Sequence, residues 1–122
     1  MNQAEQDTIV DIPRNIEGHI DLNRDLIKHP IATFYIRVAG DSMTGAGIDA
    51  GDILIVDRAA ETCDGHIVVA RISDELCVKR LCIEGSGKIW LLPANERYEP
   101  IEITEEMDFE VWGRVMHSIK TH

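Results

Sequence analysis

Residues 52 to 83 read DILIVDRAAETCDGHIVVARISDELCVKRLCI. The stretch holds three short apolar segments separated by turns that contain Gly or Asp, namely Asp52–Asp57, His66–Ile72 and Leu76–Ile83. Their length and their β-branched residues are typical of strands rather than helices. The stretch therefore predicts neighbouring β-strands.

Similar segments lie on both sides of this stretch. They are Thr33–Val38 before it, and Lys88–Leu92, Ile101–Thr104 and Phe109–Lys120 after it. Many short strands at such close spacing favour pairing between sequence neighbours. We therefore expect a mainly β fold, a barrel or a folded sheet of short, mostly antiparallel strands.

The N-terminal part has a different pattern. Asp21–Lys28 is predicted to form one short helix, with Asp21 as its N-cap and Pro30 as its stop. Residues 1–19 are polar and show no sustained period, so we expect an extended or poorly ordered arm. Residues 20–122 are then one compact domain, since 122 residues suit a single hydrophobic core.

The charge of the chain restricts its partners. Twelve basic residues against 22 acidic ones give a net charge of −10, and Lys79-Arg80 is the only adjacent basic pair. This balance disfavours direct binding to nucleic-acid phosphates and to anionic membranes. The N-terminus has no signal-peptide pattern, and the apolar runs are too short to span a bilayer. We expect a cytoplasmic protein.

The cysteines do not predict a disulfide or a metal site. Cys63, Cys77 and Cys82 are an odd number in a chain without an export signal, so reduced thiols are expected. Cys77 and Cys82 point to opposite faces of one predicted strand. Cys63 and His66 have ligand-like spacing, but no second pair accompanies them. We expect neither a metal nor another cofactor.

Ser42 lies in the sequence GDSMTGAG at residues 40–47, between two predicted strands. Local sequence favours a turn in which Asp41 and Ser42 bond nearby backbone amides. The glycines do not match a phosphate loop, and no G-x-S-x-G signature surrounds the serine. A nucleophilic role for Ser42 requires a neighbouring base.

Lys79 is a candidate for that base. By the alternation of a strand, Cys77, Lys79, Leu81 and Ile83 share one face, where Lys79 is the only charged group. Burial there disfavours the ammonium form, and a neutral amine is a general base. The alternative is that the side chain extends past its neighbours to water. Arg80, on the other face, does not deprotonate in proteins and is excluded as a base.

Three motifs resemble a known family. They are Gly40-Asp41-Ser42-Met43, the segment from Ile48 to Asp57 (IDAGDILIVD), and Val78-Lys79-Arg80-Leu81. They are similar to the serine–lysine self-cleaving peptidase domain of LexA, lambda-type repressors and UmuD, and most similar to the UmuD type. Ile20–Asn23, His29-Pro30, Pro93, Asn95, Tyr98–Ile101 and Val111–Gly113 add to this resemblance, which runs from about Ile20 to Lys120.

The resemblance implies an activity and partners. Ser42 would be the catalytic nucleophile and Lys79 the general base, with Asp41 and Met43 beside an oxyanion site formed by backbone amides. The UmuD type implies an accessory subunit of an error-prone translesion DNA polymerase in the SOS response to DNA damage. Its implied partners are a second copy joined through the C-terminal strands, a UmuC-like catalytic subunit, and the RecA–single-stranded DNA filament that triggers cleavage.

The chain departs from the UmuD pattern at the bond to be cut. UmuD-type members are cleaved at a Cys-Gly or Ala-Gly bond upstream of the segment that matches Ile20–Asn23, and no such bond precedes Ile20 here. Aligned on the serine, the scissile bond falls near Gln6-Asp7, where neither residue is small. We therefore expect a mature-length form without its own cleavage site, or a piece cut from a longer precursor.

Two alternative kinds of protein use the same serine–lysine pair. A C-terminal dimerisation module of a LexA- or phage-type repressor requires a DNA-binding segment, and the 19-residue arm is too short to hold one. A signal-peptidase relative requires a membrane anchor or an apolar membrane-facing loop, and the sequence has neither.

Overall fold

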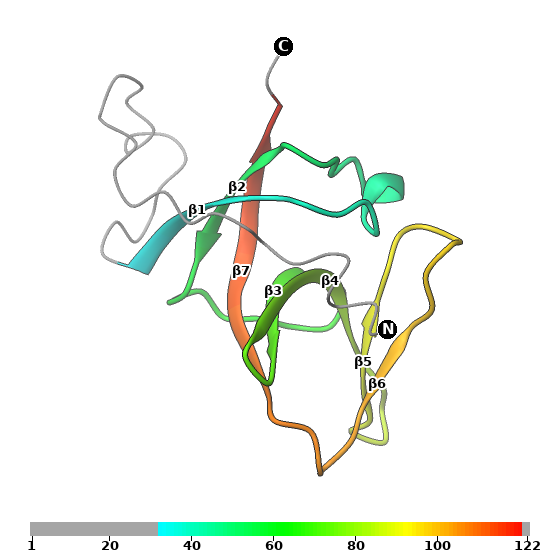
Figure 1. Cartoon of the computed structure of the whole chain (residues 1–122). Coiled ribbons are helices and arrows are strands. Elements are labelled where there is room, and N and C mark those ends of the chain that lie inside the picture. Colours follow the sequence, from blue (N-terminus) through cyan, green and yellow to red (C-terminus); the bar gives the residue numbers. More distant parts are fainter. Residues whose placement is uncertain (1–31, 121–122) are drawn as a thin grey trace.

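The computed structural model describes residues 32–120 and contains one antiparallel sheet of seven strands in the order β1-β2-β7-β3-β4-β5-β6 (Figure 1). The strands are β1 (Thr33–Arg37), β2 (Ile53–Asp57), β3 (Ile67–Ile72), β4 (Glu75–Ile83), β5 (Ile89–Leu92), β6 (Ile101–Ile103) and β7 (Phe109–Ile119). A single 3-10 turn, η2 (Thr44–Ala46), lies between β1 and β2.

The predicted fold class is confirmed. Each predicted strand is present with bounds within one residue of those expected, and every pairing is antiparallel. Of the two expected arrangements, the described strands form the folded sheet, since β1 and β6 stand at its two ends. The predicted helix Asp21–Lys28 and the arm at residues 1–19 lie outside the described residues.

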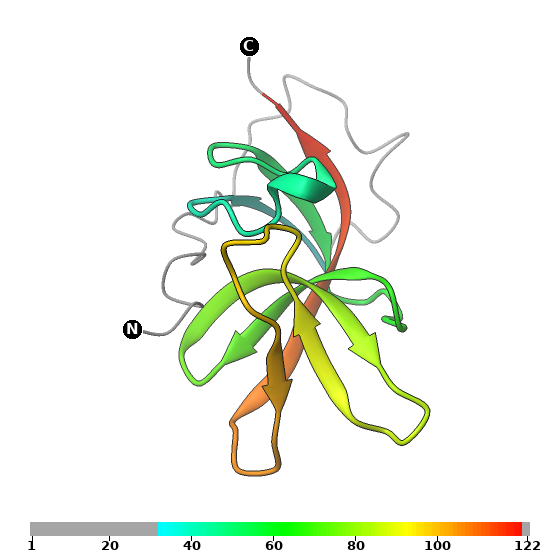
Figure 2. The ribbon, with the colours of Figure 1, turned by 90° about the vertical axis from the view of Figure 1, so that its right-hand side faces the viewer.

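Strand β7 joins the two halves of this sheet. Its C-terminal part pairs with β2 and its N-terminal part pairs with β3, and Arg114 takes part in both pairings. The register shifts once on each side, which leaves Met116 and Trp112 as extra residues of β7. Such bulges bend and twist a strand. As Figure 2 shows, the sheet folds so that β1 and β2 lie at one end and β3 to β6 at the other.

Two apolar cores follow from this folding. The first contains Ile36, Val38, Met43, Ile48, Leu54, Val56, Val69 and Val78, and the second contains Val68, Ala70, Ile72, Cys77, Leu81 and Leu91. Strands β3 and β4 contribute to both cores, because successive side chains of a strand point to opposite faces. The face of β4 that belongs to the second core is the one that carries Lys79.

Candidate active site

The turn between β1 and β2 holds Ser42. Its two ends are closed by backbone hydrogen bonds between Val38 and residues 51 and 52. The amides of Ala46 and Ile48 both donate to the carbonyl of Met43, and Gly47 has a φ of 83°, a left-handed conformation that suits glycine. The predicted turn is therefore confirmed, and its backbone is fixed immediately after Ser42. The side chains of Asp41 and Ser42 interact with those of Tyr98, Arg97 and Lys79, whereas local sequence favours nearby backbone amides as their partners.

Lys79 reaches this turn from β4. Its Nζ lies 2.7 Å from Ser42 Oγ, within hydrogen-bond distance. The exposed fraction is 0% for Lys79 and 1% for Ser42, so both side chains are buried. The alternative in which Lys79 extends to water is therefore wrong, and the alternation of β4 correctly predicted its inward orientation. A neutral amine at this distance can accept the hydroxyl proton as the serine attacks.

The loop between β5 and β6 holds the serine turn in place. The Ala94 amide donates to the Ser42 carbonyl, and the Gly45 amide donates to the Ala94 carbonyl, each over 2.7 Å. The Asn95 side-chain amide donates to the Asp41 carbonyl over 2.9 Å. The backbone on both sides of Ser42 is thus hydrogen-bonded to one loop, which limits its movement relative to Lys79.

Tyr98 belongs to the same loop. Its hydroxyl donates a hydrogen bond to Asp41 Oδ1, and the centroid of its ring lies 5.8 Å from Lys79 Nζ. Sequence reasoning placed Tyr98 and Asn95 in the family resemblance but gave neither a place in the site. Their segment has no regular period, so only the path of the loop brings them to Ser42 and Lys79.

The comparison with protein families agrees with this geometry. A family model described as Peptidase S24-like matches residues 6–116, which is most of the chain. The chain belongs to the Peptidase S24-like family. This is the family of LexA- and UmuD-type autocleaving serine peptidase domains, so the resemblance seen in the sequence is confirmed at family level.

Asp41 and Met43, the other two predicted residues of this S24-like domain, flank the serine on opposite sides. The carboxylate of Asp41 accepts the Tyr98 hydrogen bond and lies 3.8 Å from the guanidinium of Arg97. The Met43 side chain is buried in the first core. Within residues 32–120, the Met43 amide donates no hydrogen bond. That N–H group, next to Ser42, is available to a substrate oxygen.

The far end of β7 also contacts the serine turn of the S24-like domain. Lys120 Nζ lies 2.6 Å from Asp49 Oδ2 and 2.8 Å from Asp52 Oδ2. The hydrogen bonds to Asp49 and then Asp52 raise the pKa of Lys120. The ion pairs tie the last described residue to the segment that returns from Ser42 to β2.

The other predictions for this S24-like domain concern thiols and membranes. Cys63, Cys77 and Cys82 take part in no disulfide, and within the described residues no three side chains of His, Cys, Asp or Glu are grouped as metal ligands would be. The Cys63 amide donates to His66 Nδ1 over 3.0 Å, which closes the turn before β3.

No helix of residues 32–120 has the length and apolar character needed to cross a membrane.

Proposed function

We propose that this S24-like domain is a serine peptidase in which Ser42 is the nucleophile and Lys79 the general base. Ser42 Oγ forms a bond to the carbonyl carbon of a peptide, and its proton passes to Lys79 Nζ. The carbonyl oxygen becomes an oxyanion, for which the amide of Met43 is a donor. The proton then moves to the leaving amine as the peptide bond breaks. Water, deprotonated by the same amine, later releases the acyl group.

The observation that carries this proposal is the 2.7 Å contact between Lys79 Nζ and Ser42 Oγ in a buried position. A surface pair of these residues would be held apart by water for much of the time. Here the turn and strand β4 fix both groups, so little orientation has to be gained during the reaction.

Labelling with a fluorophosphonate probe tests the dyad without requiring a known substrate. The probe phosphorus bonds to a nucleophilic serine oxygen and fluoride leaves, which intact-mass measurement detects. We expect one adduct, at Ser42, and a rate reduced at least about 100-fold by Ser42→Ala and by Lys79→Ala. The matched controls are Ser86→Ala and Lys88→Ala, which alter the exposed turn before β5. Equal labelling of Lys79→Ala and wild type would rule out the proposed base.

Within the family we propose a UmuD-type role: an accessory subunit of an error-prone translesion polymerase in the SOS response. The motifs around Ser42 and Lys79 and the segment Tyr98–Ile101 support this role, and the net charge of −10 favours protein partners over DNA. The competing role is the dimerisation module of a LexA- or phage-type repressor. Co-purification with a UmuC-like catalytic subunit is expected for the first role and contradicts the second.

The proposed role leads to a second prediction, which concerns cleavage. Because no Cys-Gly or Ala-Gly bond precedes Ile20, we expect no shortening when the protein is incubated with a RecA–single-stranded DNA filament. Intact-mass measurement over the incubation checks this, with a cleavable UmuD-type protein as positive control. A cut within residues 1–30 would show that the chain does carry its own substrate bond.

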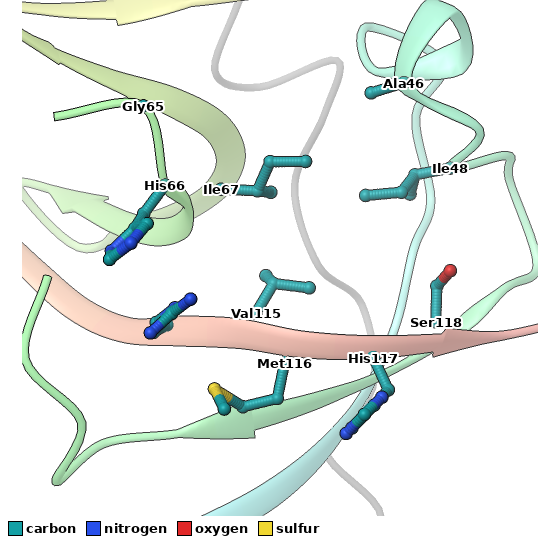
Figure 3. A pocket seen from close by; sticks show the side chains of 10 residues that line it. Ala46, Ile48, Gly65, His66, Ile67, Val115, Met116, His117 and Ser118 are labelled. Atoms are coloured by element: carbon teal, nitrogen blue, oxygen red, sulfur yellow. The ribbon is translucent and has the colours of Figure 1, made fainter. Parts of the chain in front are cut away.

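We also propose a homodimer joined through β7. From Val115 to Ile119, β7 pairs with β2 on one side, and no strand of residues 32–120 pairs with its other side. A hollow of about 310 Å³ lies along this edge (Figure 3). The side chains of Ile48, Ile67 and Val115 point into it. An open strand edge beside apolar side chains is suited to pairing with the same edge of a second copy about a two-fold axis.

Sedimentation velocity tests this dimer. Ser118 is exposed and lines the same hollow, so Ser118→Arg places a bulky charge on the edge without altering a core. We expect a dimer for the wild type and for the control Ser86→Arg, and a monomer for Ser118→Arg. A wild-type monomer, or a Ser118→Arg dimer of unchanged affinity, would refute pairing through this edge.

A further inference from the structure

Two separate parts of the Tyr98 side chain interact with Asp41 and with Lys79. The hydroxyl binds the carboxylate of Asp41, the residue before Ser42, and the ring lies with its centroid 5.8 Å from Lys79 Nζ. We propose that Tyr98 is a positioning residue whose ring stabilises the Lys79 ammonium that forms when Ser42 attacks. The inference rests on the proposed Ser42–Lys79 chemistry.

The ring acts differently before and after proton transfer. The face of an aromatic ring attracts a cation within about 6 Å, and attracts a neutral amine far less. Lys79 Nζ is inside that distance, and its burial removes the water that would otherwise solvate the new charge. An interaction that is stronger after the proton has moved lowers the barrier to attack, because it favours the transition state over the resting state.

The hydroxyl has a separate effect on geometry. Asp41 is bound twice by the β5–β6 loop, at its carbonyl by Asn95 and at its carboxylate by Tyr98. Ser42, the next residue, is bound at its carbonyl by Ala94. Loss of the Tyr98 hydroxyl removes one of these bonds but keeps the ring beside the amine. The two parts of Tyr98 therefore predict two different kinetic effects.

The groups around the amine determine the expected pH dependence. The described neighbours of Lys79 include Ser42, the Tyr98 ring with Asp41 beyond it, Cys77 on the same face of β4, and Val68 opposite on β3. Removing the ring takes away a contact that favours the protonated amine. For a variant without the ring, the rate profile is therefore expected to move to lower pH, and the fastest rate to fall, because the ammonium formed during attack is less stabilised.

The experiment measures fluorophosphonate labelling of Ser42 from about pH 6 to about pH 10. For Tyr98→Leu we expect the midpoint of the rate profile to move down by roughly 0.5 to 1.5 pH units, and the plateau rate to fall by about 3- to 30-fold. For Tyr98→Phe, which keeps the ring, we expect a slower rate at an unchanged midpoint. Thermal unfolding of each variant identifies any that fail to fold.

A matched control is available one strand away. The Trp90 ring lies 5.8 Å from Lys88 Nζ, the same separation as in the Tyr98–Lys79 pair. Lys88 is exposed and Trp90 half-buried, and Trp90 pairs with Cys82, which points to the face of β4 opposite Lys79. Trp90→Leu is expected to leave labelling unchanged. The inference is overturned if Tyr98→Leu keeps the wild-type midpoint, or if Tyr98→Phe shifts it as far as Tyr98→Leu does. Failure of the dyad itself appears separately, as wild-type labelling that does not depend on Lys79.

Discussion

Lys79 has no exposed surface, and a buried amine reduces stability compared with an apolar side chain of similar size. Met is nearly as long as Lys and needs no solvation. We expect Lys79→Met to lower probe labelling of Ser42 by at least about 100-fold while leaving the melting temperature unchanged or raising it. Calorimetry together with labelling checks both parts. A loss of more than about 2 kcal/mol in the free energy of unfolding would show that Lys79 stabilises the fold.

Gly45 tests the contact between the serine turn and the β5–β6 loop. A Cβ atom at this position would lie 2.5 Å from the carbonyl oxygen of Ala94, so one of the two backbones has to move. Because Ala94 also binds the Ser42 carbonyl, Gly45→Ala is expected to slow labelling by about 10-fold or more and to cost about 1–3 kcal/mol of stability.

Gly85→Ala is the control for this substitution, since nothing lies within 4 Å of a Cβ there and its φ is not in the left-handed region. We expect it to match the wild type in labelling rate and in melting temperature. If Gly45→Ala also labels like the wild type, the Ala94 contact does not hold the serine in its reactive position.

At the scale of the elements, the sequence predicted the strands well because their alternation is local. The same alternation predicted that Lys79 points inward on β4. The path of β7 was not predictable in this way, since the bulges at Met116 and Trp112 interrupt the two-residue period on which the prediction of strands depends. The place of Tyr98 depends on how an irregular loop folds back over the turn, which no local pattern specifies.

The start of β7 is joined to β3 by an ion pair that has a pH dependence. Arg71 binds Asp108 and Glu110, and its hydrogen bond holds the pKa of Asp108 below the usual 3.8. A lowered pKa stabilises the fold above 3.8, and that contribution is lost as the pH falls through the folded value. Arg71→Gln is therefore expected to lower the melting temperature slightly at pH 7, because the pair is exposed.

The difference in melting temperature between wild type and Arg71→Gln is expected to shrink towards zero as the pH falls below about 4. Thermal unfolding followed by circular dichroism, at several pH values between neutral and strongly acidic, measures this difference. If the difference in melting temperature stays constant into strong acid, Arg71 stabilises the fold through contacts other than its ion pairs.

For the whole molecule, the net charge of −10 opposes association of two identical chains. Salt screens that repulsion, whereas contact between the apolar side chains along the β7 edge does not depend on charge. We expect the proposed dimer to tighten as NaCl rises from about 20 mM to about 500 mM, measured by sedimentation equilibrium. Dissociation at the higher salt concentration would indicate that ion pairs hold the two copies together.

Ser42 lies beside β1 and β2, Lys79 belongs to β4, and in the described sheet β7 is the strand that pairs with both halves. It is also the last strand of the sheet to be synthesised. A nascent chain that lacks β7 already contains the serine, the lysine and the β5–β6 loop, but not the strand that joins the two halves of the sheet. Since the serine turn and β4 belong to different halves, we expect Ser42 to become reactive towards a probe only after β7 has been synthesised.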